Sequence, residues 1–502
     1  MLLRALRERQ RRRYLTKRYP NAHPLAKQSP TGVPEDLAPR APWLKSVRHL
    51  DPLGPVRDSP IHSSIERLVP REQWEHAQLL HESDSVRRLC NDGLVNTFTL
   101  GEAYFDRTLQ TDIRSLTSPE VSVSIASEKR PLELELRMAE TWLQINHALL
   151  ADGLGLLDAH DGNFGVDDSL HPVWIDHGSI VHVHNPLLGL HEFLETRLFP
   201  AAIRIRHPAL GELLRGKRIS WVAYWEIRPF SGSLLAMAFA LKRVLSAGPS
   251  IWRRKDPSSA ISPSEAISAP SVWMVRLRRI ILALLNFAAN RLRRSARASG
   301  FWSDYRPDSA EPALATRTER DRTIISTAAS LEWSSCTDIG ANAGHHVLGL
   351  ATVVEGARRF TAVDPDDFAL SKFVRAVETL EVPHTFSAQL GSLFSDSDPA
   401  DLVLALALTH HLALQQHYPL DAIAGQLALR SRKYCIVEFM PMGLTTTERV
   451  LASRHAPTPN WYSEANFVAA MARHFHRVSE IGRTYFGESD IPHRIAFLAA
   501  NA

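Results

Sequence analysis

The clearest chemical signal in the sequence is the run D-I-G-A-N-A-G at residues 338–344. It follows an apolar stretch, precedes a helical pattern at residues 345–355, and is followed by a second apolar stretch that ends in Asp364. This order predicts a strand, a tight turn, a helix and a second strand. Gly340 and Gly344 would let the backbone approach a ligand closely. Asp364 is placed to accept hydrogen bonds from both hydroxyls of a ribose.

Two features separate this turn from the dinucleotide site of a dehydrogenase. The turn lacks the G-x-G-x-x-G spacing that places a pyrophosphate on a helix N-terminus. The Asp338 carboxylate precedes the glycines and would repel a pyrophosphate, whereas it suits a ligand with an ammonium and a sulfonium. S-adenosylmethionine is such a ligand. The D-x-G-x-N-x-G turn resembles motif I of the class I methyltransferases, and Asp364 resembles their ribose-binding acid.

Three polar residues follow two further apolar stretches. Residues 401–408 predict a strand buried on both faces, after which come His410 and His411, and residues 434–437 predict another core strand that ends in Glu438. Open α/β sheets bind their ligands at the carboxyl ends of the strands. The histidines could act as general base for a hydroxyl acceptor, or they could shape the pocket floor without proton transfer. Glu438 could contact substrate or cap the next loop.

The runs D-I-G-A-N-A-G, L-A-L-T-H-H-L, I-V-E-F-M-P and N-W-Y-S-E-A-N-F together resemble the bacterial methyltransferase-like proteins related to the nodulation protein NoeA. The resemblance implies a seven-stranded, Rossmann-like α/β fold over residues 300–502, closed by antiparallel strands near residues 478–481 and 494–498. It implies a reaction class without naming the acceptor. Gln389 stands where many class I enzymes present an acid to the adenine amine, and its amide oxygen could accept that bond. The S-adenosylmethionine-binding residues that the resemblance implies are Asp338, Gly340, Asn342, Gly344 and Asp364.

A second set of polar residues lies in the N-terminal half. Asp158 and Asn163 have the D-x-x-x-x-N spacing of a kinase catalytic loop, and Asp176 in D-H-G resembles the metal-binding D-F-G. No glycine-rich loop and no early-strand lysine can be matched in residues 46–157. The sequence therefore predicts an α+β domain with degenerate kinase-like motifs at residues 46–245, a vestigial lobe that stabilises the methyltransferase.

Length and composition define the remaining expectations. A chain of 502 residues with 44% hydrophobic and 22% charged residues predicts a globular protein of two or more domains. Three distant cysteines exclude a disulfide scaffold and a cysteine-based zinc site, so we expect no metal and a reducing, cytoplasmic location. No apolar region follows the N-terminal arginines, and none is long enough to cross a bilayer.

The pattern along the chain predicts four segments. Residues 1–45 form a basic, proline-punctuated arm, whose first 20 residues could contact nucleic acid or an anionic membrane, although a solvated tail is the simpler interpretation. Residues 46–245 form the kinase-like domain, with an amphipathic helix at residues 134–150. Residues 246–299 form a Ser/Pro linker and a basic amphipathic helix, which could lie on a membrane surface but which we expect to pack on a neighbouring domain. Residues 300–502 form the methyltransferase domain.

The sequence is compatible with three functional hypotheses. The first is a methyltransferase that transfers a methyl group from S-adenosylmethionine to a small acceptor, such as a hydroxyl of a saccharide or a secondary metabolite. The second is a non-catalytic S-adenosylmethionine-binding interaction protein. The third is a bifunctional protein with phosphotransfer in its N-terminal domain.

Overall fold

A computed structural model describes residues 56–58, 64–106, 111–121, 123, 125–183, 185–220, 223–224, 272–296, 318–443, 447, 460–485 and 492–501. The predicted basic arm and the Ser/Pro-rich residues 246–271 lie outside the described residues. The chain divides into two compact units, residues 1–77 with 100–117, and residues 78–99 with 118–502. The unit boundary thus falls inside the predicted kinase-like domain, whose limits stay a prediction.

The first unit is built around a four-stranded sheet. Its strand order is β1-β2-β4-β3, and β1 and β2 are antiparallel. Leu68 and Val69 of β2, and Ile113 and Leu116 of β4, are buried, so apolar residues are enclosed on both faces of this sheet. The strand bounds are β1 Val56–Asp58, β2 Ser64–Pro70, β3 Thr99–Asp106 and β4 Thr111–Pro119. Helix α2, Trp74–Glu82, follows β2.

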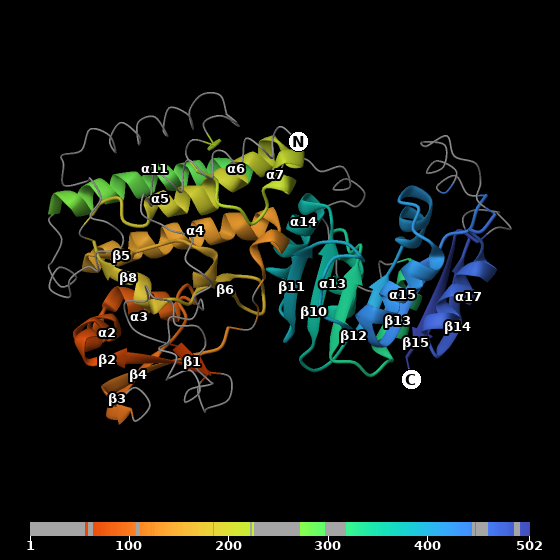
Figure 1. The fold of residues 1–502 in the computed structure, drawn as a ribbon, viewed down its shortest axis with the longest axis horizontal. Helices are drawn as coiled ribbons and strands as arrows, with labels where there is room; N and C mark the ends of the chain where they lie inside the picture. The colour runs from red at the N-terminus through yellow and green to blue at the C-terminus, as the bar shows by residue number, and fades with distance from the viewer. Residues whose placement is uncertain are drawn as a thin grey trace, which may run out of the picture. The chain divides into compact units, whose positions relative to one another are not determined.

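The N-terminal half of the second unit is mostly helical (Figure 1). Helix α4, Leu132–Leu149, confirms the helix expected at residues 134–150, and its periodic apolar residues Met138, Trp142 and Ile145 are buried. Two short antiparallel pairs follow it, β5 with β8 and β6 with β7. The bounds are α3 Asp84–Asn91, β5 Leu154–Leu156, β6 Phe164–Val166, β7 Pro172–Trp174, β8 Ile180–His182, α5 Leu190–Phe193, α6 Phe199–Arg206 and α7 Pro208–Leu213.

The predicted basic amphipathic helix is α11, Val272–Ala296. It packs against α4 through a buried face that includes Ile281 and Leu285. Arg278 lies in this face with no exposed surface and donates to the Leu188 carbonyl at 2.8 Å and to the Asn146 side chain. The expectation that this helix packs on protein is therefore confirmed. No helix among the described residues is long and apolar enough to cross a membrane.

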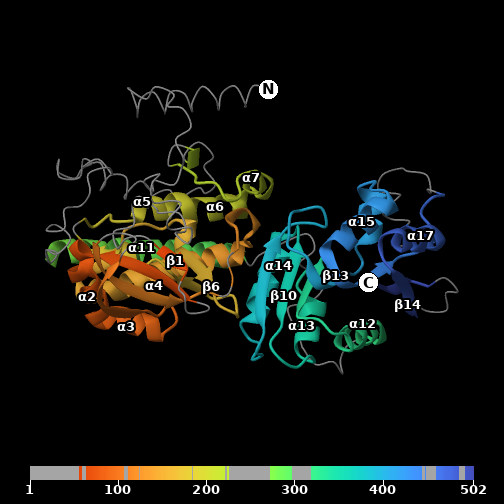
Figure 2. The ribbon, with the colours of Figure 1, turned by 60° about the horizontal axis from the view of Figure 1, so that its bottom comes forward.

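The C-terminal half of the second unit contains a seven-stranded sheet of order β11-β10-β9-β12-β13-β15-β14 (Figures 1 and 2). The first five strands of this order are parallel, and β15 is antiparallel to both of its neighbours. The predicted α/β sheet with closing antiparallel strands is thus confirmed. The strand bounds are β9 Ser335–Ile339, β10 Arg359–Asp364, β11 Thr385–Leu390, β12 Ala400–Ala405, β13 Ser431–Phe439, β14 Arg477–Thr484 and β15 Arg494–Ala500.

The strand order reverses direction between β9 and β12. From β9 the chain proceeds to β10 and β11 on one side, whereas β12 and β13 lie on the other side. Such a reversal opens a crevice outside the carboxyl ends of the strands, where open α/β sheets bind ligands. The turn after β9 begins at this point. The accompanying helices are α12 Glu319–Ala329, α13 His345–Ala351, α14 Asp367–Val377, α15 Leu420–Arg430 and α17 Glu464–His474.

A large apolar cluster holds this sheet to α15 and α17. Val403 and Cys435 contribute from the sheet, Ile423 and Leu427 from α15, and Phe467 from α17, and all five are buried. The interpretation of Cys435 as a core residue is therefore confirmed. This packing fixes the ends of β12 and β13, after which the two predicted histidines and Glu438 are found.

Candidate functional site

The turn between β9 and α13 has an unusual backbone. Gly340, Asn342 and Gly344 all adopt left-handed conformations, with φ of 78°, 51° and 76°. The Gly340 amide donates to the Val363 carbonyl at 2.8 Å, which folds the turn over the end of β10. Since asparagine tolerates this conformation better than most residues with a Cβ, the N in D-x-G-x-N-x-G suits the turn itself.

Gly344 permits a close approach between two helices. A Cβ at this position would lie 2.1 Å from Cδ2 of Phe373 on α14. No side chain fits there without a shift of the buried aromatic ring. The contact with Phe373 is thus one reason for a glycine at this position, and the predicted close approach of a ligand to the Gly344 backbone stays a prediction.

Asp338 is a buried carboxylate with an unsatisfied oxygen. Its side chain is 1% exposed, and among the described residues its Oδ2 atom has no hydrogen-bond partner. Burial, together with the negative charge of Asp364, raises the pKa of Asp338 to about 8. An acid in this state gains from any cation or donor that reaches Oδ2, because a buried polar group without a partner is costly. The predicted role in holding an ammonium group fits this environment.

Asp364 closes the turn. Its Oδ2 accepts from the Asn342 amide at 2.8 Å, and its Oδ1 accepts from the Asp366 amide at 2.7 Å. Burial raises the pKa of Asp364 to about 6, against the lowering effect of these two bonds. A carboxylate has about four acceptor sites, so two remain for a ligand. The structure thus brings Asp338, Asn342 and Asp364 together, as predicted.

Gln389 lies on the neighbouring strand at the same edge. In the register of β10 and β11, it is opposite Val363, one residue before the pair of Leu390 with Asp364. It is half-buried, and its amide nitrogen donates to the Ser387 hydroxyl at 3.3 Å. This bond orients the amide, and the oxygen remains the acceptor that was predicted to bind an adenine amine.

Glu438 is part of a buried ion-pair network. It has no exposed surface, and its two oxygens accept from Arg320 at 2.5 and 2.6 Å. Arg494 adds a contact at 3.1 Å, and the Ala407 amide donates at 2.9 Å. Burial raises the pKa of Glu438, but the hydrogen bonds and the positive charge of Arg320 outweigh burial and lower this pKa to about 2. The carboxylate is therefore committed to protein groups, which favours a role in positioning over contact with substrate.

The sequence analysis missed the two arginines. Arg494 could be linked to Glu438 through the register of two predicted strands. Glu438 pairs with Ala496 across β13 and β15, and Arg494, two positions from Ala496, lies on the same face of the sheet. Arg320 had no such link, because its helix α12 precedes Glu438 by more than a hundred residues and no local pattern connects the two.

A second missed cluster joins α12 to the start of α13. Asp321 lies 3.3 Å from His345 and 3.0 Å from His346, measured from oxygen to Nε2. Although burial opposes it, the hydrogen bonds with these histidines hold the pKa of Asp321 well below its usual range. The cluster ties the helix that follows the turn to α12.

His410 and His411 lie directly after β12, and their ring centroids are 4.0 Å apart. His410 is 2% exposed, and burial, with the charges of His411 and Arg494, lowers its pKa to about 2. Burial also lowers the pKa of His411, which is half-buried and lies 3.1 Å from the Gln415 side-chain oxygen. Both rings are thus neutral at pH 7. His410 is a weak proton acceptor, so His411 is the better candidate for a general base.

The kinase-like residues meet around the β6–β7 hairpin. The Asn163 side chain donates to Asp158, and the Ile175 amide donates to the Asn163 carbonyl at 2.9 Å. Asp176 follows β7 and accepts from the Gly178 amide at 3.2 Å. In the part of the chain that the structure describes, no group of three or more His, Cys, Asp or Glu side chains could hold a metal ion. The kinase-like interpretation stays a prediction.

Comparison with known proteins identifies one curated relative. The chain is 26% identical to nodulation protein NoeA of Rhizobium meliloti (strain 1021) over 411 residues, which cover 77% of this chain and 83% of NoeA. No family model matches the sequence.

Two solved structures each resemble part of this chain. Magnesium protoporphyrin IX methyltransferase from Synechocystis PCC 6803, with bound S-adenosylhomocysteine, has 14% identity and a TM-score of 0.28, and covers 42% of this chain and 94% of its own. WbdD has 16% identity and a TM-score of 0.28, and covers 39% of this chain and 38% of its own.

The extent of the NoeA similarity is informative. Residues 318–502, which contain the seven-stranded sheet, make up less than half of the chain, so a match over 77% of it must include much of the helical half as well. The resemblance inferred from four short motifs is therefore confirmed over most of both chains. This chain is a homologue of nodulation protein NoeA.

Proposed function

We propose that this protein is a methyltransferase that uses S-adenosylmethionine to methylate a small acceptor. The observation that carries the proposal is the Oδ2 atom of Asp338, which is buried at the carboxyl edge of the sheet without a hydrogen-bond partner among the described residues. Buried carboxyl groups are rarely left without a partner. The ammonium group of a methionine moiety would supply the missing hydrogen-bond donor and a positive charge against which Asp338 can ionise.

The surrounding residues fit the rest of such a cofactor. Asp364 keeps two acceptor sites after binding the amides of Asn342 and Asp366, and these suit the two ribose hydroxyls. Gln389 lies one strand further along the same edge and offers an amide oxygen to the adenine amine. When bound, the cofactor supplies an electrophilic methyl group on a sulfonium.

The proposal names the chemical class of the methyl acceptor, a hydroxyl compound. A hydroxyl group on a saccharide or a secondary metabolite must lose its proton as it is methylated, so a neutral base is required. His411 is neutral at pH 7 and only half-buried, whereas His410 is almost fully enclosed. We assign proton removal to His411 and shaping of the pocket to His410.

A second candidate function is non-catalytic binding of S-adenosylmethionine. One observation favours it: of the three residues predicted to be catalytic, Glu438 is occupied by two arginines, and His410 is too weak a base. Of these three residues, His411 is the remaining candidate for proton transfer.

The experiment combines binding and turnover on the full chain. Calorimetry measures the affinity for S-adenosylmethionine, and release of S-adenosylhomocysteine is followed with saccharides and hydroxylated metabolites as acceptors. Product release that depends on an added acceptor, and that His411→Ala reduces while affinity stays within twofold, supports the methyltransferase. Tight binding without turnover for any acceptor favours the second candidate. Absence of binding contradicts both.

A further inference from the structure

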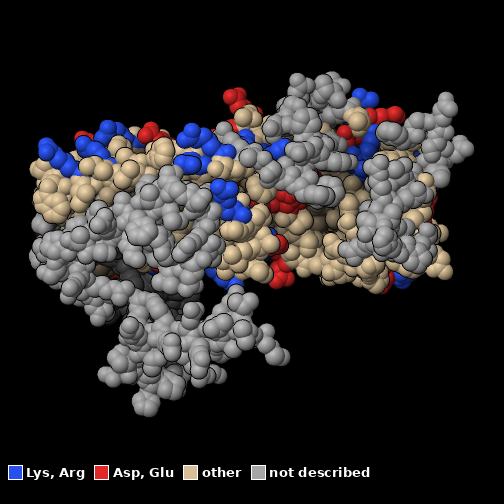
Figure 3. Space-filling model, turned by 90° about the horizontal axis from the view of Figure 1, so that it is seen from above, with Lys and Arg blue, Asp and Glu red and all other residues tan. Residues whose placement is uncertain are grey.

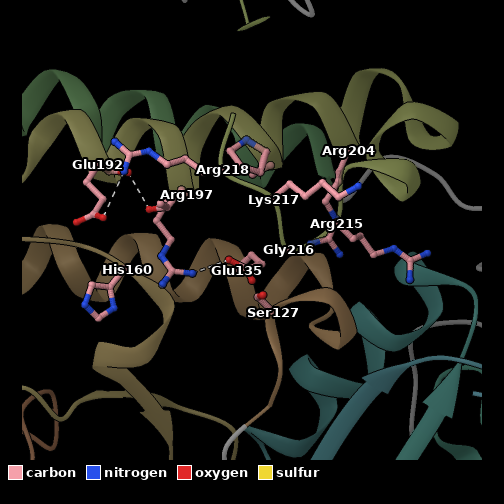
Figure 4. A pocket seen from close by; sticks show the side chains of 13 residues that line it. Ser127, Glu135, His160, Glu192, Arg197, Arg204, Arg215, Gly216, Lys217 and Arg218 are labelled. Atoms are coloured by element: carbon pink, nitrogen blue, oxygen red, sulfur yellow. Dashed lines mark hydrogen bonds and ion pairs between the residues drawn. The ribbon is translucent and has the colours of Figure 1, made fainter. Parts of the chain in front are cut away.

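A cavity of about 240 Å³ lies in the helical half of the second unit (Figure 4). It lies beside α6 and the segment that follows α7, and Arg204, Arg215 and Lys217 gather at one end of it, away from His160. Seen from above, the described surface in the left half of Figure 3 also carries many Lys and Arg side chains. The charged side chains that line the cavity are Arg197, Arg204, Arg215, Lys217, Arg218, Glu135 and Glu192.

Both carboxylates of the lining already accept bonds from protein groups. Glu135 binds Arg197 at 2.9 Å, and Glu192 accepts from the Ala159 amide at 3.0 Å. Arg218 binds Glu195, a residue outside the lining, at 2.6 Å. The charges at the His160 end are therefore largely compensated.

The opposite end has an excess of positive charge. Arg204 is 2.6 Å from Asp367, but Arg215 pairs at 3.2 Å with Glu212, whose side chain is 68% exposed and well hydrated. Lys217 donates to the Leu213 carbonyl at 3.2 Å, which brings no negative charge. Burial, together with the positive charge of Arg204, lowers the pKa of Arg215. Within the described part of the chain, two guanidinium groups and an ammonium thus lie close together with a single well-placed carboxylate, that of Asp367.

The backbone holds these cations in place. Gly216, between Arg215 and Lys217, has φ of 64°, and a Cβ there would lie 2.8 Å from the Ser127 hydroxyl and 2.9 Å from the Glu128 amide nitrogen. The turn can therefore neither carry a larger residue nor move towards Ser127 without a collision. The backbone from which Arg215 and Lys217 extend is therefore restricted, which lowers the entropic cost of ordering this segment when an anion binds.

We propose that this cavity binds the phosphate group of a small phosphorylated ligand, with Arg204, Arg215 and Lys217 as the anion-binding side chains. Phosphate is close to dianionic at neutral pH, which matches the excess charge, and guanidinium groups bind it through paired N–H donors. Ser127 and Thr196 also line the cavity, and because the Thr196 hydroxyl donates to the Glu192 carbonyl at 2.8 Å, its oxygen can serve the remainder of the ligand as an acceptor. The volume lies below the ~300 Å³ at which pockets for drug-sized ligands begin, so a sugar phosphate fits better than a nucleoside triphosphate.

The test uses the full chain at constant ionic strength. Glucose 6-phosphate, inorganic phosphate, ATP and unphosphorylated glucose are titrated by calorimetry, with sodium chloride added to equalise the salt. The variants are Arg215→Gln and Lys217→Gln, and Arg206→Gln is the matched control, an exposed arginine at the end of α6 that does not line the cavity. Because Lys217 is exposed, its replacement should leave folding unchanged.

We expect glucose 6-phosphate to bind more tightly than inorganic phosphate, and glucose not to bind. Each cavity variant should weaken binding of both phosphates about tenfold, as expected for loss of a charge-assisted hydrogen bond, whereas Arg206→Gln should change it less than twofold. Equal binding of the phosphates to Arg215→Gln and Arg206→Gln overturns the proposal. Binding of ATP alone, lost in Asp176→Ala and kept in Lys217→Gln, also overturns it, because the anion site would then lie at the kinase-like residues.

Discussion

The carboxylate of Glu438 and the guanidinium of Arg320 form a bidentate ion pair, with oxygen–nitrogen distances of 2.5 and 2.6 Å, in a part of the fold with almost no access to water. This pair joins α12 to the end of β13, and Arg494 extends it to β15. The same carboxylate accepts from the Ala407 amide, directly after β12. One side chain thus fixes the relative positions of three segments at the edge where the site residues are found.

Replacing Glu438 by Gln should destabilise the protein by about 3–5 kcal/mol, because it leaves two largely enclosed arginines, with side chains 12% and 11% exposed, without their carboxylate. Denaturant unfolding of the full chain measures this effect. The control is Glu464→Gln, since Glu464 pairs with Arg483 on the surface, where an ion pair contributes at most about 1 kcal/mol. Equal losses in the two variants would contradict the structural role of Glu438.

The Glu438 ion pair also predicts a pH dependence. The folded-state pKa of about 2 lies below the ordinary value of a glutamate, so the stabilisation is complete above that ordinary value and is lost as the pH falls towards 2. The difference in unfolding free energy between wild type and Glu438→Gln should therefore shrink between about pH 4.5 and pH 2. A difference that stays constant over this interval would exclude the depressed pKa.

Gly344→Ala should lower the unfolding free energy by at least about 2 kcal/mol, since it combines a positive φ with a contact of 2.1 Å to Phe373. Adding Phe373→Leu replaces the obstructing ring by a smaller side chain. The double variant should therefore lose less stability than the sum of the two single variants. Additive losses would show that the glycine is not required by Phe373.

The kinase-like residues should not form an ATP site that depends on Asp176. Asn163 is bonded to Asp158, and no phosphate-covering loop or early-strand lysine was matched in the sequence. Addition of Mg²⁺ and ATP should therefore not raise the melting temperature through Asp176, so wild type and Asp176→Ala should respond alike. A true site would stabilise the folded protein by about 2–3 kcal/mol at saturating ligand. Asp158→Ala should lower stability without any nucleotide, because Asn163 loses its acceptor. A nucleotide-dependent shift that vanishes in Asp176→Ala would contradict this prediction and place a nucleotide site at these residues.

The buried carboxylate of Asp338 should cost stability at neutral and alkaline pH. Its pKa of about 8 is raised above the unfolded value, so the contribution present at low pH is lost as the pH rises towards 8. Asp338→Asn avoids this loss. Its unfolding free energy relative to wild type should increase between about pH 4 and pH 8, by at most about 1.4 kcal/mol per pH unit. Thermal unfolding across this range measures the difference, and a parallel dependence in both proteins would show that Asp338 ionises normally.

The sequence predicted the strands around Asp338 and Asp364 because each lies at the end of a short apolar run, and the carboxyl ends of parallel strands meet at one edge. It also predicted α4 and α11 from their amphipathic periodicity. The contact between Gly344 and Phe373 was not predicted, because Phe373 belongs to another helix and nothing in the local sequence indicates the contact. Arg320 and Asp321 were missed for the same reason: α12 meets β13 and α13 only in the folded chain.

Binding of S-adenosylmethionine to the full chain, measured by calorimetry at pH 7 in buffers of different ionisation enthalpy, tests the central claim most directly. Asp338 should be largely protonated in the free protein and ionised against the ligand ammonium, so binding should release close to one proton. Asp338→Asn should weaken binding at least tenfold, as expected for loss of a bond to a charged group, and should abolish the proton release. Asp401→Asn, which removes a buried carboxylate at the opposite end of the neighbouring strand β12, should leave both quantities unchanged. Unaltered affinity and proton release in Asp338→Asn would contradict the account.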